Sequence, residues 1–172
     1  MTQKSKASVP MSAVERWRYL VEADRAQTAS VAARAESTPA QRWTPARAEA
    51  FRANPKRLGD ADVEAVARFI RDDQTLLDVG AGAGRLALPL ALRSKHVTAV
   101  EASPNMAAIL KEQAIGAGIS NVTLIEGRWQ DADAPVADVA LCFNVMNFVP
   151  DIDAFIRKLD AHAHDRVLVV LM

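Results

Sequence analysis

The chain of 172 residues is 50% hydrophobic, which fits a single domain of ordinary size with a sizeable core. Its 21 basic and 21 acidic side chains cancel, which gives no general attraction to nucleic acid, and its one cysteine, Cys142, excludes an internal disulfide and suggests no metal site. The N-terminus lacks a signal-peptide pattern and no apolar run reaches membrane length, so we expect a cytoplasmic protein with no membrane partner.

Helices are expected along the first 70 residues. Ser12 and Glu15 have the spacing of a capping box, which predicts a helix from there to about residue 35. A second helix is expected over 45–53, and Asp60 then caps a third. The apolar stripe of this third helix consists of Val63, Val66, Phe69 and Ile70.

We interpret residues 1–57 as an N-terminal helical extension or lid, and residues 58–172 as the main domain. The first 60 residues hold 11 Lys or Arg against 6 Asp or Glu, which we read as the solvated faces of helices. Aromatic side chains are frequent in the extension. They either line a binding pocket or pack the helices against the main domain, and we favour the second role. They are Trp17, Tyr19, Trp43 and Phe51.

Short apolar runs alternate with helical patterns from residue 75 onward, which is typical of a parallel sheet covered on both faces. The expected strands are 75–79, 97–101, 122–126, 138–143 and 166–171. The expected helices between them are 84–94, 104–117 and 151–162. We therefore predict an α/β fold with a Rossmann-like, mostly parallel sheet sandwiched by helices. Pro89 lies inside the first of these helices and predicts a kink there.

The stretch LLDVGAGAGR holds three of the seven glycines, at Gly80, Gly82 and Gly84. A strand, a glycine loop and a helix in this order let a ligand approach the backbone closely, and we expect the loop's amide N–H groups to point outward. The dinucleotide pattern G-x-G-x-x-G/A fails here, because its last position falls on Arg85. The loop therefore predicts a nucleotide-like ligand of another kind.

Two acidic residues narrow the choice of ligand. Asp78 lies just before the loop, where it would repel a diphosphate and attract a ligand that carries an amine and a sulfonium. Glu101 ends the next strand, 21 residues after Gly80, where a carboxylate can accept both hydroxyls of a ribose. Together they predict an adenosine ligand with a positive end.

Residues 76–172 resemble the class I S-adenosylmethionine-dependent methyltransferase family. The matching pieces stand in the family's order, and they are LLDVGAGAGRLALPLA, TAVEASPNM, NVTLIEGRWQD, ADVALCFNVMNFVPDIDAFIRKL and RVLVVL. The resemblance implies S-adenosylmethionine as the cofactor and methyl transfer as the activity.

The resemblance also implies a set of cofactor-binding residues around the ends of the strands. They are Asp78, Gly80, Ala81, Gly82, Gly84, Glu101, Ala102, Ser103, Met106, Arg128, Trp129 and Asn144. By this resemblance Asp78 and the glycines line the methionine end, and Glu101 holds the ribose. Those expected near the adenosine are Ala102, Ser103 and Met106. Arg128 and Trp129 would contact the adenine, although Trp129 could equally pack in the core. Asn144 would lie near the transferable methyl, or else only shape the turn after its strand.

The methyl acceptor is expected to be a small molecule. Family members that methylate amides and bases show Asn/Asp-Pro-Pro-Tyr/Phe after the fourth strand, whereas this chain has Asn-Val-Met-Asn at 144–147. DNA or glutamine N-methylation is therefore disfavoured, and nucleic acid is not the partner we expect, although a protein or RNA acceptor stays open. No general base or metal is assigned. Two alternatives stand beside this hypothesis: a non-catalytic cofactor-binding module or partial protein that needs a partner, and an NAD-dependent oxidoreductase.

The last expected strand ends with the chain, at Leu171 and Met172. Family members usually continue with a further helix and a strand pair. An apolar strand left as an open edge promotes aggregation. We therefore expect the edge to be covered by a missing C-terminal segment of a longer protein, by a second copy or partner chain, or by the N-terminal helices.

Overall fold

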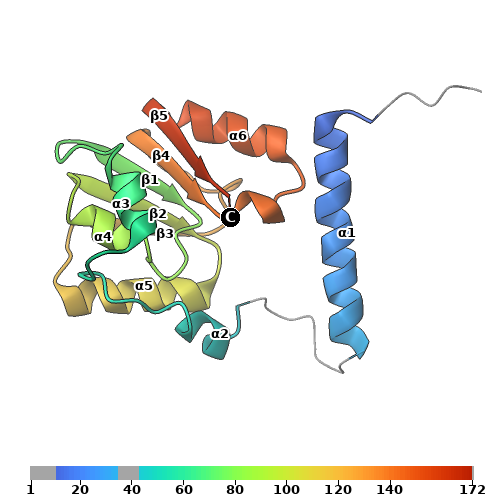
Figure 1. The fold of residues 1–172 in the computed structure, drawn as a ribbon, viewed down its shortest axis with the longest axis horizontal. Helices are drawn as coiled ribbons and strands as arrows, with labels where there is room; N and C mark the ends of the chain where they lie inside the picture. The colour runs from blue at the N-terminus through green and yellow to red at the C-terminus, as the bar shows by residue number, and fades with distance from the viewer. Residues whose placement is uncertain (1–10, 35–42, 172) are drawn as a thin grey trace, which may run out of the picture.

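A computed structural model describes residues 11–34 and 43–171 (Figure 1). Its five parallel strands form one sheet in the order β3-β2-β1-β4-β5. The strands are β1 (Thr75–Val79), β2 (His96–Glu101), β3 (Val122–Glu126), β4 (Ala137–Phe143) and β5 (Ala163–Val170). The helices are α1 (Ala13–Arg34), α2 (Pro45–Glu49), α3 (Ala61–Ala67), α4 (Ala87–Ala91), α5 (Pro104–Ala117) and α6 (Ile152–Ala161), with a 3-10 turn η1 (Met146–Phe148). The predicted α/β architecture is therefore confirmed.

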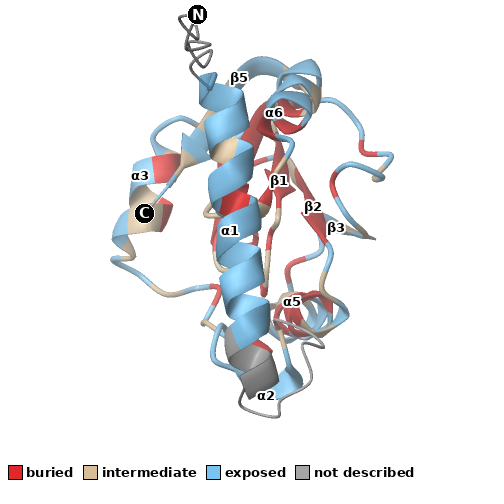
Figure 2. Cartoon of the chain, turned by 90° about the vertical axis from the view of Figure 1, so that its right-hand side faces the viewer, coloured by how far each residue is buried: buried red, intermediate tan, exposed pale blue. Residues whose placement is uncertain are grey.

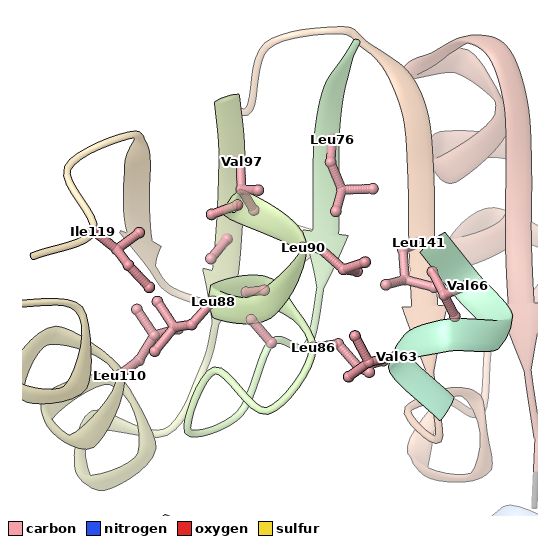
Figure 3. Packing of buried hydrophobic residues seen from close by; sticks show 14 of the residues in the cluster. Val63, Val66, Leu76, Leu86, Leu88, Leu90, Val97, Leu110, Ile119 and Leu141 are labelled. Atoms are coloured by element: carbon pink, nitrogen blue, oxygen red, sulfur yellow. The ribbon is translucent and has the colours of Figure 1, made fainter. Parts of the chain in front are cut away.

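One face of the sheet is covered by α3, α4 and α5 (Figure 3). Side chains alternate between the two faces along each strand, so Leu76 of β1 and Val97 of β2 point to this side. They meet Leu88 and Leu90 of α4 and Leu110 of α5. All five side chains are almost wholly buried. This layer fixes where the glycine loop leaves β1.

The opposite face is covered by α6 and by the connection between β3 and β4. Leu77 and Val79 of β1 pack there against Phe155 and Leu159 of α6. The indole of Trp17 in α1 joins the same cluster from outside. The sheet is thus sandwiched, as expected, with one helix carrying most of this second layer.

Three helices are shorter than the sequence suggested, and the first of them, α2, ends at Glu49 and not at residue 53. The turns of the glycine loop continue to Leu86, so α4 begins at Ala87 and not at residue 84. Pro89 consequently lies in the first turn of α4, where no intrahelical N–H is needed, and the expected kink has no cause. Likewise α3 stops at Ala67, so Phe69, which was predicted as part of its apolar stripe, lies after the helix and is 50% exposed.

The two helix starts that were expected from capping residues, those of α1 and α3, are confirmed. The Ser12 N–H donates to Glu15 Oε2 at 2.8 Å and the Glu15 N–H donates to Ser12 Oγ at 3.3 Å, which is the capping box of α1. The Asp60 carboxylate accepts from the N–H groups of Asp62 and Val63 at the start of α3. Both caps are local, so the sequence alone could place them.

Helix α1 lies beside the carboxyl ends of the strands and is mostly exposed (Figures 1 and 2). The Trp17 Nε1–H donates to Val149 O at 2.9 Å, and Arg25 donates to Phe148 O at 2.6 Å. No helix within 11–34 and 43–171 is long and apolar enough to cross a membrane. In the described part of the chain, β5 is an edge strand that pairs with β4 alone. The described residues before β1 form helices and contribute no strand to that edge.

Candidate functional site

The candidate site lies at the carboxyl ends of β1 and β2. The strand order reverses between β1 and β4, and open parallel sheets bind their ligands at such a reversal. Beside this reversal, a cavity of about 380 Å³ opens at the carboxyl ends of β2 and β3, within the size range of small-molecule sites. Its lining residues are Trp43, Glu101, Ala102, Ser103, Pro104, Asn105 and Arg128.

Glu101 connects the glycine loop with the loop after β2, which lines this cavity. Its Oε2 accepts from the Gly82 N–H at 2.8 Å, and its Oε1 accepts from the Ser103 N–H at 2.7 Å. The residue is 8% exposed. Burial raises the pKa of the Glu101 carboxyl, and the backbone hydrogen bonds from residues such as Ser103 and Gly82 partly oppose that rise. The carboxylate thus holds the glycine loop and the start of α5 in a fixed relation.

The amides of the glycine loop are used inside the protein. The N–H groups of Gly80 and Ala81 both donate to Val100 O, at 2.8 and 3.1 Å. The Gly84 N–H donates to Ala81 O at 3.0 Å, while that of Gly82 donates to Glu101. The expectation of outward-pointing amides is therefore wrong for these positions. What the loop provides for a ligand is close approach to the backbone, because its glycines carry no side chains.

Each of the three loop glycines has a positive φ, and their surroundings differ. A Cβ on Gly80 would overlap Val145 Cγ2, from the turn after β4. A Cβ on Gly84 would meet Leu88 at 2.9 Å. A Cβ on Gly82, in contrast, would meet no atom within 4 Å. Gly80 and Gly84 are thus required by packing, whereas Gly82 borders open space.

Asp78 lies beneath the loop and is 2% exposed. Its Oδ2 finds no hydrogen-bond partner among the described residues. Burial raises the pKa of Asp78 to about 7, and the nearby carboxyl of Glu101 contributes to the rise. A buried carboxyl without a partner is costly when ionised. A cationic group placed next to it would favour the ionised form.

The structure brings four of the twelve predicted cofactor residues to the cavity. Ala102, Ser103 and Arg128 line the cavity with Glu101. Ser103 is also the N-cap of α5, where its Oγ accepts from the Met106 N–H. The Met106 side chain does not line the cavity, since it is buried in the small cluster beneath it.

Asn144 and Trp129 lie elsewhere. Asn144 has a left-handed φ of 54° directly after β4, and its N–H donates to Val170 O at 2.9 Å. Trp129 is 4% exposed and packs in the core between the sheet and α6. Lys158 Nζ lies 4.6 Å from the centre of its ring, and His162 meets the ring edge-on. Its predicted contact with adenine is corrected accordingly: the structure gives Trp129 its alternative place, in the core.

Trp43 is a lining residue that was not among the predicted cofactor residues. The sequence left it two roles, to line a pocket or to hold the extension against the domain, and we favoured the second. Its position depends on contacts with residues some 60 positions later, such as the hydrogen bond from Asn105 Nδ2 to Trp43 O at 2.7 Å. The only hint in the sequence was the high aromatic content of the extension.

Comparison with known proteins gives a consistent result. A family model described as a methyltransferase domain matches residues 76–165. A probable ribosomal RNA small subunit methyltransferase A of Methanosphaera stadtmanae is 39% identical over 69 residues, which is 40% of this chain and 26% of that protein. A ubiquinone biosynthesis O-methyltransferase of Paramagnetospirillum magneticum is 32% identical over 118 residues, which is 64% of this chain and 47% of that protein. The chain thus spans about a quarter to a half of the length of these relatives.

Solved structures share the fold. An S-adenosylmethionine-dependent methyltransferase from Aquifex aeolicus superposes with a TM-score of 0.64 at 20% identity, over 74% of this chain and 72% of that one. One from Thiobacillus denitrificans, in complex with S-adenosyl-L-homocysteine, gives 0.58 at 19% identity, over 70% and 51%. At such identities the likeness establishes the architecture.

Proposed function

The chain belongs to the S-adenosylmethionine-dependent methyltransferase family, and we propose that it binds this cofactor in the cavity beside Glu101 and transfers its methyl group to an acceptor. The observation that carries the proposal is the arrangement of two buried carboxyls under one glycine loop. Asp78 and Glu101 lie at the ends of neighbouring strands, at 2% and 8% exposure. Such a pair suits a ligand that carries the two hydroxyls of a ribose, for Glu101, and a positive charge, for Asp78.

The residues present fit the cofactor. Each carboxylate oxygen of Glu101 already accepts one backbone N–H and retains a lone pair for a ribose hydroxyl. The unpartnered Oδ2 of Asp78 supplies negative charge for the cationic methionine end. Gly82 leaves free space above the loop, where any side chain would stand in the way.

The cofactor supplies a methyl group that is already activated by a positively charged sulfur. The protein's task is then to hold the cofactor and to orient its methyl group toward the acceptor. Glu101 fixes the glycine loop against the start of α5, so the binding surface is formed in advance. Alignment of reacting groups can contribute about 7–11 kcal/mol to such a reaction. A base is needed only where the acceptor holds its proton tightly.

A small-molecule acceptor is the candidate we favour. The relative named for ubiquinone biosynthesis matches 64% of this chain, and the chain carries no net charge that would attract a polyanion. We propose that residues 1–57 act as the extension or lid over the main domain, because α1 stands beside the carboxyl ends of the strands (Figure 2). A small acceptor would enter between α1 and the cavity.

RNA is the second candidate. The relatives named ribosomal RNA methyltransferases reach 39% identity, although over 69 residues only. The first 60 residues also hold 11 basic against 6 acidic side chains, which could meet phosphates. An acceptor screen that includes quinol precursors and small-subunit ribosomal RNA separates the two.

Calorimetric titration with S-adenosylmethionine and S-adenosylhomocysteine tests the cofactor, with NAD as the negative ligand. Glu101→Gln should weaken binding by about tenfold or more, because a charged hydrogen bond contributes about 1.5–3 kcal/mol. Glu126→Gln is the matched control, since Glu126 is the register partner of Glu101 on β3 and is exposed. Binding of NAD alone would overturn the proposal, as would equal affinity in the two variants.

A further inference from the structure

Trp43 stands at the rim of the cofactor cavity, although it belongs to the N-terminal extension. Its carbonyl accepts from Asn105 Nδ2 at 2.7 Å, which ties it to the first turn of α5. Phe51 meets the indole edge-on, with ring centres 5.0 Å apart and planes at 84°. The indole therefore has a defined position rather than a free one.

The segment that carries Trp43 is anchored to the glycine loop by one glutamine. Gln113 of α5 is 8% exposed. Its Oε1 accepts from the Ala53 N–H at 2.9 Å, and its Nε2 donates to Ala83 O at 2.6 Å. Ala48 of α2 is wholly buried against Ala83 in the same cluster. The extension and the glycine loop thus share one rigid support.

We infer that Trp43 forms a wall of the cavity and stacks on the adenosine half of the cofactor, an inference that rests on the proposed function. The cavity brings the indole together with Glu101 and Arg128. Trp43 is its only aromatic lining residue among those described. Purine rings stack favourably on such faces. With Trp129 in the core, Trp43 is the tryptophan available to do so.

The packing supports this role over a purely structural one. The contact between α2 and the domain is made by the small, fully buried Ala48. Trp43 packs against the edge of that cluster and stays partly exposed on the cavity side. Trp43 therefore has one side packed against the domain and another side open to the cavity.

Fluorescence and calorimetry with S-adenosylhomocysteine test the inference without any acceptor. Trp43→Ala should weaken binding by about tenfold, as expected for loss of one base-stacking partner. Trp43→Phe keeps a ring and should bind nearly as the unchanged chain does, but should lose the change in tryptophan fluorescence on binding. Trp17→Phe is the matched control, since Trp17 bonds to Val149 O outside the cavity and should leave that change intact.

The outcomes separate the two proposals. If Trp43→Ala binds S-adenosylhomocysteine as tightly as the unchanged chain while Glu101→Gln binds weakly, the stacking role is overturned and the cofactor proposal stands. If the unchanged chain binds neither cofactor form, the proposed function itself fails. Should Trp43→Ala fail to fold, Trp43→Phe decides alone, because a retained fluorescence change in that variant refutes the contact.

Discussion

Replacing Asp78 by asparagine should make the protein more stable at neutral and alkaline pH while it weakens cofactor binding. Asp78 is 2% exposed, and its Oδ2 lacks a hydrogen-bond partner among the described residues. Burial, reinforced by the nearby carboxyl of Glu101, raises its pKa from 3.8 to about 7. Asparagine has nearly the same shape and never ionises, so it removes this cost.

The magnitude follows from the two pKa values. The folded chain favours the neutral carboxyl, so the contribution of Asp78 to stability is full below pH 3.8 and is lost as pH rises through about 7. The difference between 3.8 and about 7, at about 1.4 kcal/mol per pH unit, corresponds to about 4 kcal/mol. Asp78→Asn should recover most of that free energy of unfolding at pH 8 and almost none at pH 4.

Urea unfolding of both chains between pH 4 and pH 8 measures this difference directly. Asp78→Asn should keep the contribution of Glu101 to the pH dependence, since burial raises the pKa of that carboxyl too. Titration with S-adenosylhomocysteine at pH 7.5 should show the opposite sign, since the variant lacks negative charge for the ligand's ammonium. Equal pH slopes in the two chains would refute the reasoning, because they would mean that Asp78 ionises in the fold as easily as in water.

Two glycine substitutions test the loop. In Gly82→Ala the new methyl meets no protein atom within 4 Å, so we expect a stability loss of about 1–2 kcal/mol from φ +57° and a fall of about tenfold or more in cofactor affinity. Gly118→Ala, with φ +69° and equally open surroundings, is the matched control; equal affinities in both variants would remove Gly82 from the site. Gly80→Ala should cost about 2–5 kcal/mol in urea unfolding, because its Cβ overlaps Val145 and its φ is +77°. Adding Val145→Ala should restore the part due to overlap, and no restoration would contradict the packing argument.

The sheet was largely predictable because its determinants are local. The bounds of β1, β3 and α5 agree with the expected ranges, and α5 is bounded by a Ser103 cap and by Gly118 in the left-handed conformation. The start of α4 was not predictable to the residue. The loop turns through Leu86 because Gly84 fits beneath Leu88, and that packing is invisible before the chain is folded.

The candidate site was predictable where strands end and unpredictable where distant segments meet. Glu101 follows from its place at the end of β2, and the structure puts it on the cavity as expected. Both tryptophans had two expected places: Trp43 takes the less favoured one, on the cavity beside Asn105, and Trp129 takes the core position, beside Lys158. No spacing rule along the chain links residue 43 with 105, or 129 with 158.

Gln113 has a consequence for the order in which the molecule opens. Because its one side chain bonds both the Ala53 amide and the Ala83 carbonyl, α2 and the glycine loop should exchange their amide hydrogens as a single cooperative unit with α5. Helix α1 is mostly exposed, and its hydrogen bonds to Phe148 O and Val149 O end at the η1 turn, outside the strands. Helix α1 can therefore detach from the domain and return many times while the cofactor site stays folded. Helix α2, in contrast, detaches only when that site unfolds.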